Sequence, residues 1–311
     1  MGLGLVSLLY GISHLASSLT DLQTWIPIVL GVALLAAFVI SQAKVKNPFF
    51  PVSMFAKPVF IAAICAGFVY NFSNAVGFLQ LTNLWQYIGG LKTSEVSMWQ
   101  LPLLAAGILG ALVFGRLMSR GLSSQMTILL GGIISAAGFV CAALARDSQD
   151  FVAWLPATIL IGAGVIVASL PYGTLILSEA PKEFFGPVTS SRTTFGQLFY
   201  SVGIAVSTVF IDQLTRGGVV HRLLDAGVPA DQAGTGLDAV NAYAAAGTRP
   251  STSLGHEALA DAHASYVTSF GTMMLIAAGL SVVVAFIGFV LITRANAKKA
   301  AAAPTAAPAS A

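Results

Sequence analysis

The chain has 311 residues, of which 56% are hydrophobic and only 9% are charged. A soluble globular domain carries roughly 25% charged residues, so this composition excludes a water-soluble protein and indicates that lipid is the main solvent. The formal net charge of +3 is small and gives no sign of a nucleic-acid partner. We therefore expect an integral membrane protein whose principal partner is the lipid bilayer.

Apolar segments along the chain predict eight membrane-spanning helices, because about 20 mostly apolar residues are needed to cross ~30 Å of hydrocarbon. None of them alternates strictly with a two-residue period, which favours helices over strands. The predicted spans are a short one at 1–17, followed by 24–42, 58–82, 98–117, 125–146, 152–178, 190–211 and 266–293. The predicted fold class is therefore all-α, a polytopic membrane protein.

Two further segments are too polar or too rich in small residues and proline to span a membrane. Residues 212–264 contain Pro229 and Pro250 and are expected to form a long loop that can include short helices. Residues 294–311 are an Ala/Pro tail for which we predict disorder.

The distribution of Lys and Arg predicts which side of the membrane each loop occupies. With a cytoplasmic N-terminus and eight spans, both termini are cytoplasmic and the inside carries most of the 15 basic residues. The positive-inside rule favours this orientation, which we expect in the plasma membrane. The inside set is Lys44, Lys46, Lys57, Arg116, Arg120, Lys182, Arg192, Arg294, Lys298 and Lys299, and the outside set is Lys92, Arg146, Arg216, Arg222 and Arg249.

Side chains that could carry covalent or metal chemistry are few and scattered. Cys65 and Cys141 both lie inside apolar runs, and the 4 histidines form no cluster with carboxylates at metal-ligand spacing. No convincing Ser/His or Asp pair lies within the spans, as an intramembrane protease would need. We therefore expect no enzymatic activity, no metal and no cofactor.

Carboxylates are absent from the core of every predicted span. The nearest acids, such as Asp212 and Glu179, lie at predicted helix ends. Intramembrane acids usually mark ion or proton pathways. Either the chain does not couple to protons, or the coupling residue belongs to a part that is not in this sequence.

One face of the third predicted span is polar and aromatic. Asn71, Asn74, Phe78, Thr82 and Trp85 recur at spacings of three to four residues, and the two asparagines fall near the predicted midplane. Amides and aromatic rings can line a cavity for an amphipathic substrate. They also serve as interhelical hydrogen-bonding contacts in membrane proteins, and the sequence leaves both interpretations open.

A similar patch occurs in the seventh predicted span. Gln197, Tyr200 and Ser201 lie within one turn of each other. The same two interpretations apply, and we take Gln197 and Tyr200 as further candidates for a substrate cavity.

Residues 114–121 read Phe-Gly-Arg-Leu-Met-Ser-Arg-Gly. This resembles the signature between paired helices of the major facilitator superfamily, although Ser119 stands where the family usually has Asp. In the family this loop is thought to latch one conformation by charge contacts. The resemblance implies such a role for Gly115, Arg116 and Arg120; the alternative is that both arginines are plain positive-inside anchors.

The order of segments is similar to that of the fourteen-span drug:proton antiporter branch of this superfamily. The similarity covers an amphipathic cytoplasmic linker, the first hairpin of the C-terminal bundle and a later pair of helices. It rests on residues 44–51 and 54–57, then on 84–89 and 100–102, and then on 178–181 with Gly186, Arg192, Gly196 and Gly203.

The resemblance implies a division of the chain and a function. Two linker helices would occupy 1–42, the amphipathic linker 43–57, a six-helix bundle 58–293 with the extracytoplasmic loop 212–264, and a cytoplasmic tail 294–311. The family's N-terminal six-helix bundle, which carries most of its membrane-embedded acids, has no counterpart here. The implied function is that of the C-terminal part of a proton-coupled efflux antiporter for small amphipathic or drug-like substrates, working by alternating access.

Alternatives to this function remain open at the level of sequence. The chain could be a truncated product without transport activity, or a subunit that pairs with a separate N-terminal six-helix half. An uptake carrier for a small metabolite is a third possibility, which charged residues facing the cavity would favour. By itself the chain is not expected to transport, because it has neither a second bundle nor an intramembrane acid.

Overall fold

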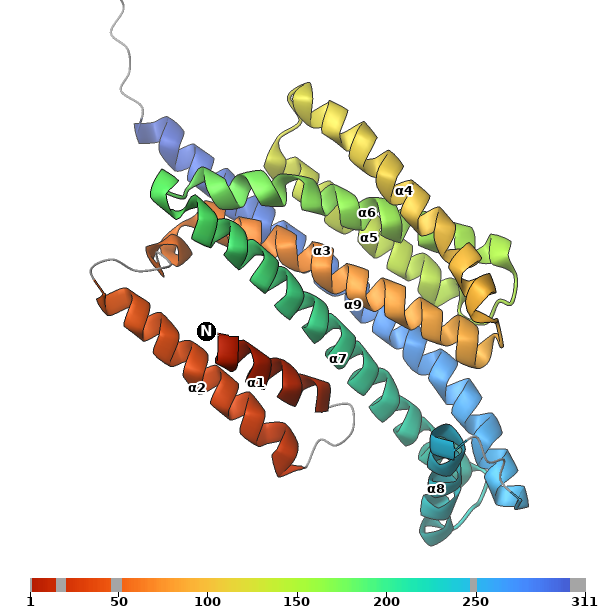
Figure 1. The fold of residues 1–311 in the computed structure, drawn as a ribbon. Helices are drawn as coiled ribbons and strands as arrows, with labels where there is room; N and C mark the ends of the chain where they lie inside the picture. Colours follow the sequence, from red (N-terminus) through yellow and green to blue (C-terminus); the bar gives the residue numbers. More distant parts are fainter. Residues whose placement is uncertain (1, 15–20, 46–51, 247–250, 303–311) are drawn as a thin grey trace, which may run out of the picture.

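The computed structural model of the protein describes residues 2–14, 21–45, 52–246 and 251–302, and within these ranges it contains helices and no strands (Figure 1). In chain order the elements are α1 (Gly2–His14), α2 (Leu22–Lys44), the 3-10 helix η1 (Val52–Ala56), α3 (Pro58–Asn83), the π-helix η2 (Leu84–Ile88), α4 (Thr93–Ser119), α5 (Ser124–Ala145), α6 (Phe151–Ser178), the 3-10 helix η3 (Lys182–Phe184), α7 (Phe185–Asp225), α8 (Ala230–Ala246) and α9 (Ser253–Ala302).

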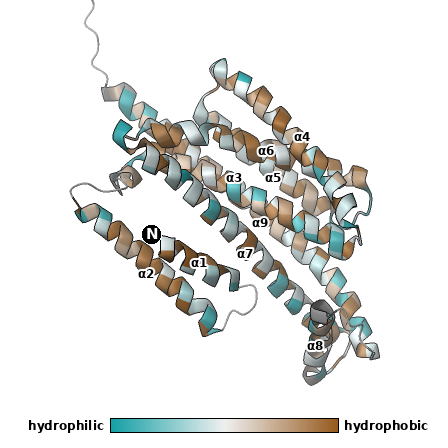
Figure 2. Ribbon diagram, in the orientation of Figure 1, coloured by the Kyte–Doolittle hydropathy of each residue, from teal (hydrophilic) through white to brown (hydrophobic). Residues whose placement is uncertain are grey.

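Among the described residues, 7 helices are long and apolar enough to cross a membrane, namely α2, α3 with η2, α4, α5, α6, α7 and α9. The predicted fold class, an all-α polytopic membrane protein, is therefore confirmed. Figure 2 shows the expected pattern on α2, which is hydrophobic along its middle and hydrophilic at its ends.

The first predicted span is shorter than expected. Helix α1 has 13 residues, and at 1.5 Å per residue a helix of this length covers only ~20 Å. A straight crossing needs ~30 Å of helix. Residues 15–20 lie outside the described part of the chain, so seven of the eight predicted spans are found as helices of sufficient length.

Six of the long helices form one bundle with α3 at its centre. Helix α3 packs on α6, α7 and α9, while α5 packs on α6 and α9, and α4 packs on α6. Apolar side chains fill the interior in two clusters, one around Phe139, Trp154 and Phe270 and the other around Phe60 and Ile128. Helix α3 therefore packs on three helices of the bundle, α6, α7 and α9.

Helices α5 and α6 approach closely because small residues lie at their crossing. A Cβ atom built on Gly138 would lie 2.5 Å from the backbone nitrogen of Ile161, and one on Gly131 would overlap the backbone of Ala168. Larger side chains at these positions would force the helices apart. Close packing of this kind is common between membrane helices, where small residues let the backbones approach.

Helices α1 and α2 form a hairpin that lies beside the bundle (Figure 1). Gly31 of α2 sits against the backbone of Leu8 in α1, and Ser7 Oγ donates a hydrogen bond of 2.8 Å to the carbonyl oxygen of Pro27. The hairpin touches the bundle through contacts between α1 and α7. It therefore borders one face of α7 and leaves the α4 side of the bundle uncovered.

The segment 212–264 was expected to be a long loop that can include short helices, and in the structure most of its described residues are helical. Helix α7 continues to Asp225, α8 spans Ala230–Ala246 and α9 begins at Ser253. Buried apolar side chains of the three helices, including Val219, Leu223 and Ala258, form a small core of their own. The abundant alanines favour helix, so the Gly and Pro residues mark turns, such as the one at Gly227 with φ +87.

The predicted disorder of 294–311 is also corrected in part. Helix α9 continues to Ala302, because an Ala- and Lys-rich run has high helix propensity. Residues 303–311 lie outside the described part of the chain. Residues 46–51 of the predicted linker 43–57 also lie outside the described part of the chain. The rest of the linker includes η1, in which the side chain of Met54 is buried among the apolar core residues.

A single carboxylate joins three helix ends at one end of the bundle. Lys57 Nζ donates to the backbone oxygen of Glu179 at 2.7 Å and lies 3.6 Å from its Oε2. Lys299 Nζ donates to Glu179 Oε1 at 3.0 Å. These contacts bring together the start of α3 and the ends of α6 and α9, three places that the charge pattern assigns to the cytoplasmic side.

Candidate substrate cavity

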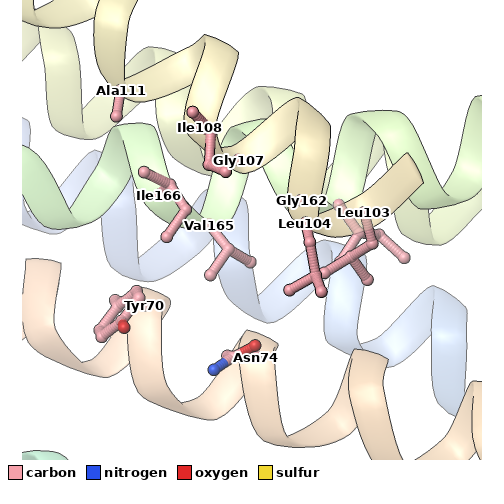
Figure 3. A pocket seen from close by; sticks show the side chains of 11 residues that line it. Tyr70, Asn74, Leu103, Leu104, Gly107, Ile108, Ala111, Gly162, Val165 and Ile166 are labelled. Atoms are coloured by element: carbon pink, nitrogen blue, oxygen red, sulfur yellow. The ribbon is translucent and has the colours of Figure 1, made fainter. Parts of the chain in front are cut away.

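A cavity of about 520 Å³ lies between α3, α4 and α6. This volume is within the usual range for small-molecule sites, which is roughly 300–1,000 Å³. Helix α3 contributes Tyr70 and Asn74, and in Figure 3 both lie on the side of α3 that faces the other two helices. The opposite walls are apolar and consist of Leu103, Leu104, Gly107, Ile108 and Ala111 of α4 and Ile161, Gly162, Val165 and Ile166 of α6.

Tyr70 and Asn74 supply the polar side-chain groups of this cavity, a hydroxyl and an amide. Within the described part of the chain, neither the Tyr70 hydroxyl nor the Asn74 amide makes a hydrogen bond. Both side chains are half-buried. Polar groups held in an apolar environment without partners cost free energy, and such groups are more often satisfied by water or a ligand. Asn74 therefore lies where a ligand could use both its donor and its acceptor.

Asn71, which the sequence groups with Asn74, lies at a different interface. Its Nδ2 donates to the carbonyl oxygen of Gly67 at 2.8 Å. Its amide also packs on α7, where a Cβ atom built on Gly196 would lie 3.2 Å from Asn71 Oδ1. Asn71 does not line the cavity that holds Asn74. The two asparagines, three residues apart, thus face different neighbours of α3.

The remaining members of the predicted polar face do not line this cavity either. Phe78 is 40% exposed. Thr82 Oγ1 donates to the carbonyl oxygen of Phe78 at 2.7 Å and accepts from Gln100 Nε2 of α4 at 2.6 Å. Trp85 lies in the π-helix η2, which changes the register of the helix, and its ring is buried among other aromatic rings.

The candidates of the seventh predicted span lie away from this cavity. Gln197 is exposed and Tyr200 is half-buried on α7. Their neighbour Ser201 borders a second cavity of about 480 Å³ between α1 and α7, together with Thr208 and Tyr10. The two polar patches predicted from the sequence therefore do not converge on one cavity in this structure.

Sequence reasoning missed the polar contact between α3 and α7. Gln80 Nε2 donates to Ser207 Oγ at 2.8 Å and lies 3.3 Å from Thr208 Oγ1. Farther along α3, the hydroxyls of Ser73 and Ser281 are 3.0 Å apart and join α3 to α9. Ser73 and Gln80 are separated by seven residues, so their shared helix face was readable from the spacing. Tyr70 was missed as well, although it precedes Asn74 by one turn.

The predicted latch residues lie at the end of α4. The side chains of Arg116 and Arg120 are exposed and make no ion pair with any residue that the structure describes. A Cβ atom added to Gly115 would have no neighbour within 4 Å. Helix α4 ends at Ser119, and Gly121 in the turn that follows has φ +110, a value that favours glycine. A latch role for these residues remains a prediction.

No Asp, Glu, Lys or Arg side chain of the residues that the structure describes is buried inside the bundle. Among the described residues, the buried polar side chains are Thr, Ser and Gln, with no Asp or Glu. Within the same ranges, no group of three or more His, Cys, Asp or Glu side chains is placed to hold a metal ion. The polar groups that line the cavity between α3, α4 and α6 are thus the uncharged side chains of Tyr70 and Asn74.

Comparison with known proteins finds distant relatives, while no family model matches the chain. The chain is 26% identical over 274 residues to the tetracenomycin C resistance and export protein of Streptomyces glaucescens, covering 85% of this chain and 50% of that protein. It is 28% identical over 199 residues to the multidrug transporter protein MdtP of Bacillus subtilis, covering 63% of this chain and 35% of that protein. It is 26% identical over 181 residues to the methylenomycin A resistance protein of Bacillus subtilis, covering 56% of this chain and 37% of that protein.

The chain is similar to drug-resistance and export proteins. Together with the apolar helices, this likeness supports membrane transport as its general function and a multi-pass membrane location. It is also consistent with the resemblance to the major facilitator superfamily. The chain spans half or less of the length of these relatives, from 35% to 50%.

Proposed function

We propose that this chain is the C-terminal part of a proton-coupled efflux transporter for small amphipathic molecules, in which α3, α4 and α6 form one wall of the substrate path. The observation that carries the proposal is the Asn74 amide, which lacks a hydrogen-bond partner among the described residues and lines a cavity of about 520 Å³. The name of the tetracenomycin C resistance and export protein supports export as the direction of transport.

The chemistry of the cavity favours an amphipathic substrate. The walls from α4 and α6 offer apolar contact, while Tyr70 and Asn74 offer one hydroxyl and one amide for orientation. An uncharged site with a few polar groups can bind compounds of different shapes, since it does not require one fixed pattern of charges.

Transport by alternating access would require a second bundle that closes the other side of the path. This chain would supply one wall and the packing surface, and a partner six-helix half would supply the other. Proton coupling would then rest on carboxylates of that partner, because no Asp or Glu is buried in the described part of this chain. Arg116 and Arg120, exposed at the end of α4, would be available for contacts across the two halves.

A chimera tests this proposal directly. The N-terminal half of the tetracenomycin C resistance and export protein would be fused to this chain and expressed in a pump-deficient bacterial host, beside this chain alone. We expect the fusion to lower the accumulation of an amphipathic dye in a proton-dependent manner, and the chain alone to have no effect. Robust proton-dependent efflux by the chain alone would contradict the need for a second half.

Within the fusion, the two asparagines provide a matched pair. Asn74→Leu should change which compounds are exported while leaving protein yield intact, because it removes polar groups of the cavity wall. Asn71→Leu should instead lower the yield, because it replaces an amide packed on Gly196 of α7. If both variants leave the substrate profile unchanged, the cavity between α3, α4 and α6 is not the substrate path.

A subunit that pairs with a separately encoded half is the second candidate, and the extent of the alignments favours it equally. Co-expression of this chain with the same N-terminal half, without fusion, distinguishes the two arrangements. Efflux from the unfused pair supports a split transporter, whereas efflux from the fusion alone supports a single longer protein.

A further inference from the structure

A crevice of about 280 Å³ lies between α7 and α9, away from the candidate substrate cavity. The α7 side consists of Leu214, Gly218, His221 and Arg222, and the α9 side of Ser265, Thr268, Ser269 and Thr272. Each set follows helical spacing, so each is one continuous face of its helix. A wall with basic residues therefore stands opposite a wall made of hydroxyl groups.

One hydroxyl of this crevice is buried and free. Ser265 is 3% exposed, and its Oγ has no hydrogen-bond partner within the described ranges of the chain. By contrast, Thr268, Ser269 and Thr272 each donate to the carbonyl oxygen four residues earlier. A buried hydroxyl without a partner is destabilising, which suggests a group that the protein itself does not supply.

The opposite wall carries an unmatched positive charge. Arg222 is exposed and makes no ion pair with the residues that the structure describes. His221 Nδ1 lies 2.8 Å from Asp225 Oδ2, which leaves its Nε2 available to another molecule. Asp212, the acid one turn before the crevice, is already paired with Arg216 at 2.8 Å. On α7, the acids beside the crevice thus have basic partners, and Arg222 does not; on α9, Asp261, one turn before Ser265, makes no ion pair with the residues that the structure describes.

The crevice lies at the boundary between polar and apolar surface. On α9, the face that bears Thr268 and Thr272 continues into Leu275 and Ile276, which are 52% and 43% exposed. Such residues contact lipid chains in a membrane protein. On α7, the crevice begins just beyond Asp212, the first charged residue after the apolar part of the helix. A ligand here would have its polar group at the level of the lipid headgroups.

We propose that this crevice binds a phosphate group, of the kind carried by an anionic phospholipid. The Arg222 guanidinium matches phosphate oxygens in charge and geometry, and the Ser265 hydroxyl can turn to donate a second hydrogen bond. The exposed Leu275 and Ile276 would lie along the acyl chains. This inference is independent of the transport function, since none of these residues lines the cavity between α3, α4 and α6.

Native mass spectrometry of the purified full chain in detergent tests the proposal. Dioleoyl phosphatidylglycerol is the probe, dioleoylglycerol is the same lipid without phosphate, and inorganic phosphate is the soluble competitor. We expect one tightly bound phosphatidylglycerol and no comparable binding of dioleoylglycerol. Arg222→Gln should weaken that binding roughly tenfold, since a hydrogen bond to a charged group is lost.

Control variants separate the crevice from general charge effects. Lys92→Gln removes a positive charge from an exposed residue outside the crevice and should leave binding unchanged. Ser265→Ala should weaken binding while preserving the fold. Displacement of the lipid by millimolar inorganic phosphate would support the site and indicate a soluble phosphate compound as its ligand. Equal binding by the wild type, Arg222→Gln and Lys92→Gln, or equal binding of both lipids, would overturn the proposal.

Discussion

Gln80 of α3 and Ser207 of α7 form a hydrogen bond of 2.8 Å in which both side chains are buried. Helices α3 and α7 border the candidate substrate cavity and the α1–α7 cavity respectively. The contact therefore fixes the relative position of the two helices on which the predicted polar patches lie.

A double-mutant cycle measures this contact. Gln80→Met keeps the size of the side chain and removes the amide, and Ser207→Ala removes the hydroxyl. We expect a coupling free energy of about 0.6 kcal/mol, typical of hydrogen bonds between membrane helices. Unfolding of the purified variants in detergent gives the value. Gln86→Met, a change at a half-buried glutamine, should show no coupling to Ser207→Ala.

Two buried tryptophans, Trp154 and Trp85, differ in whether the indole N–H donates a hydrogen bond, so comparing them measures the contribution of that bond to stability. Trp154 Nε1 donates to the carbonyl oxygen of Ser148 at 3.1 Å, whereas Trp85 Nε1 has no partner among the described residues. The rings lie 5.5 Å apart and are similarly buried. Trp154→Phe should therefore cost about 1 kcal/mol more stability than Trp85→Phe. Equal losses in thermal unfolding would show that Trp85 has an unseen partner, such as a bound water.

Two glycines should respond oppositely to the same substitution. Gly131→Ala places a methyl group against the backbone of Ala168, so we expect a loss of roughly 1–3 kcal/mol from overpacking. Gly115→Ala meets nothing within 4 Å and should be neutral or slightly stabilising, because Ala favours helix over Gly. Melting temperatures and the fraction of monodisperse protein after purification report both effects.

Glu179 should contribute a small, salt-dependent stabilisation. Its contacts with Lys57 and Lys299 join three helix ends, but the lysine side chains are 40% and 70% exposed. We expect Glu179→Gln to lower stability by no more than about 1 kcal/mol. Screening should reduce the difference from wild type at high salt. The matched change Glu183→Gln, at an exposed residue of η3, should have no measurable effect at any salt concentration.

The arrangement of helices along the chain was largely predictable. Hydropathy located the apolar parts of α2 to α7 and α9, because a membrane helix must satisfy its own backbone and present apolar side chains over a fixed length; α7 and α9 extend well beyond the predicted spans 190–211 and 266–293. For 212–264, the prediction of a long loop with short helices underestimated the helical content. There, a small apolar core around Val219, Leu223 and Ala258 stabilises helices, and the Gly and Pro residues that suggested a loop mark turns between them.

The sequence by itself determined that this is an α-helical membrane protein with little buried charge, since composition and hydropathy follow directly from the residues. Only the tertiary structure decided which polar residues act together. Asn71 and Asn74 are neighbours in sequence, yet one packs on Gly196 of α7 and the other lines the cavity toward α4 and α6. The reason is geometric: each residue of a helix is turned ~100° from the last, and the neighbour that it meets depends on how the helices pack.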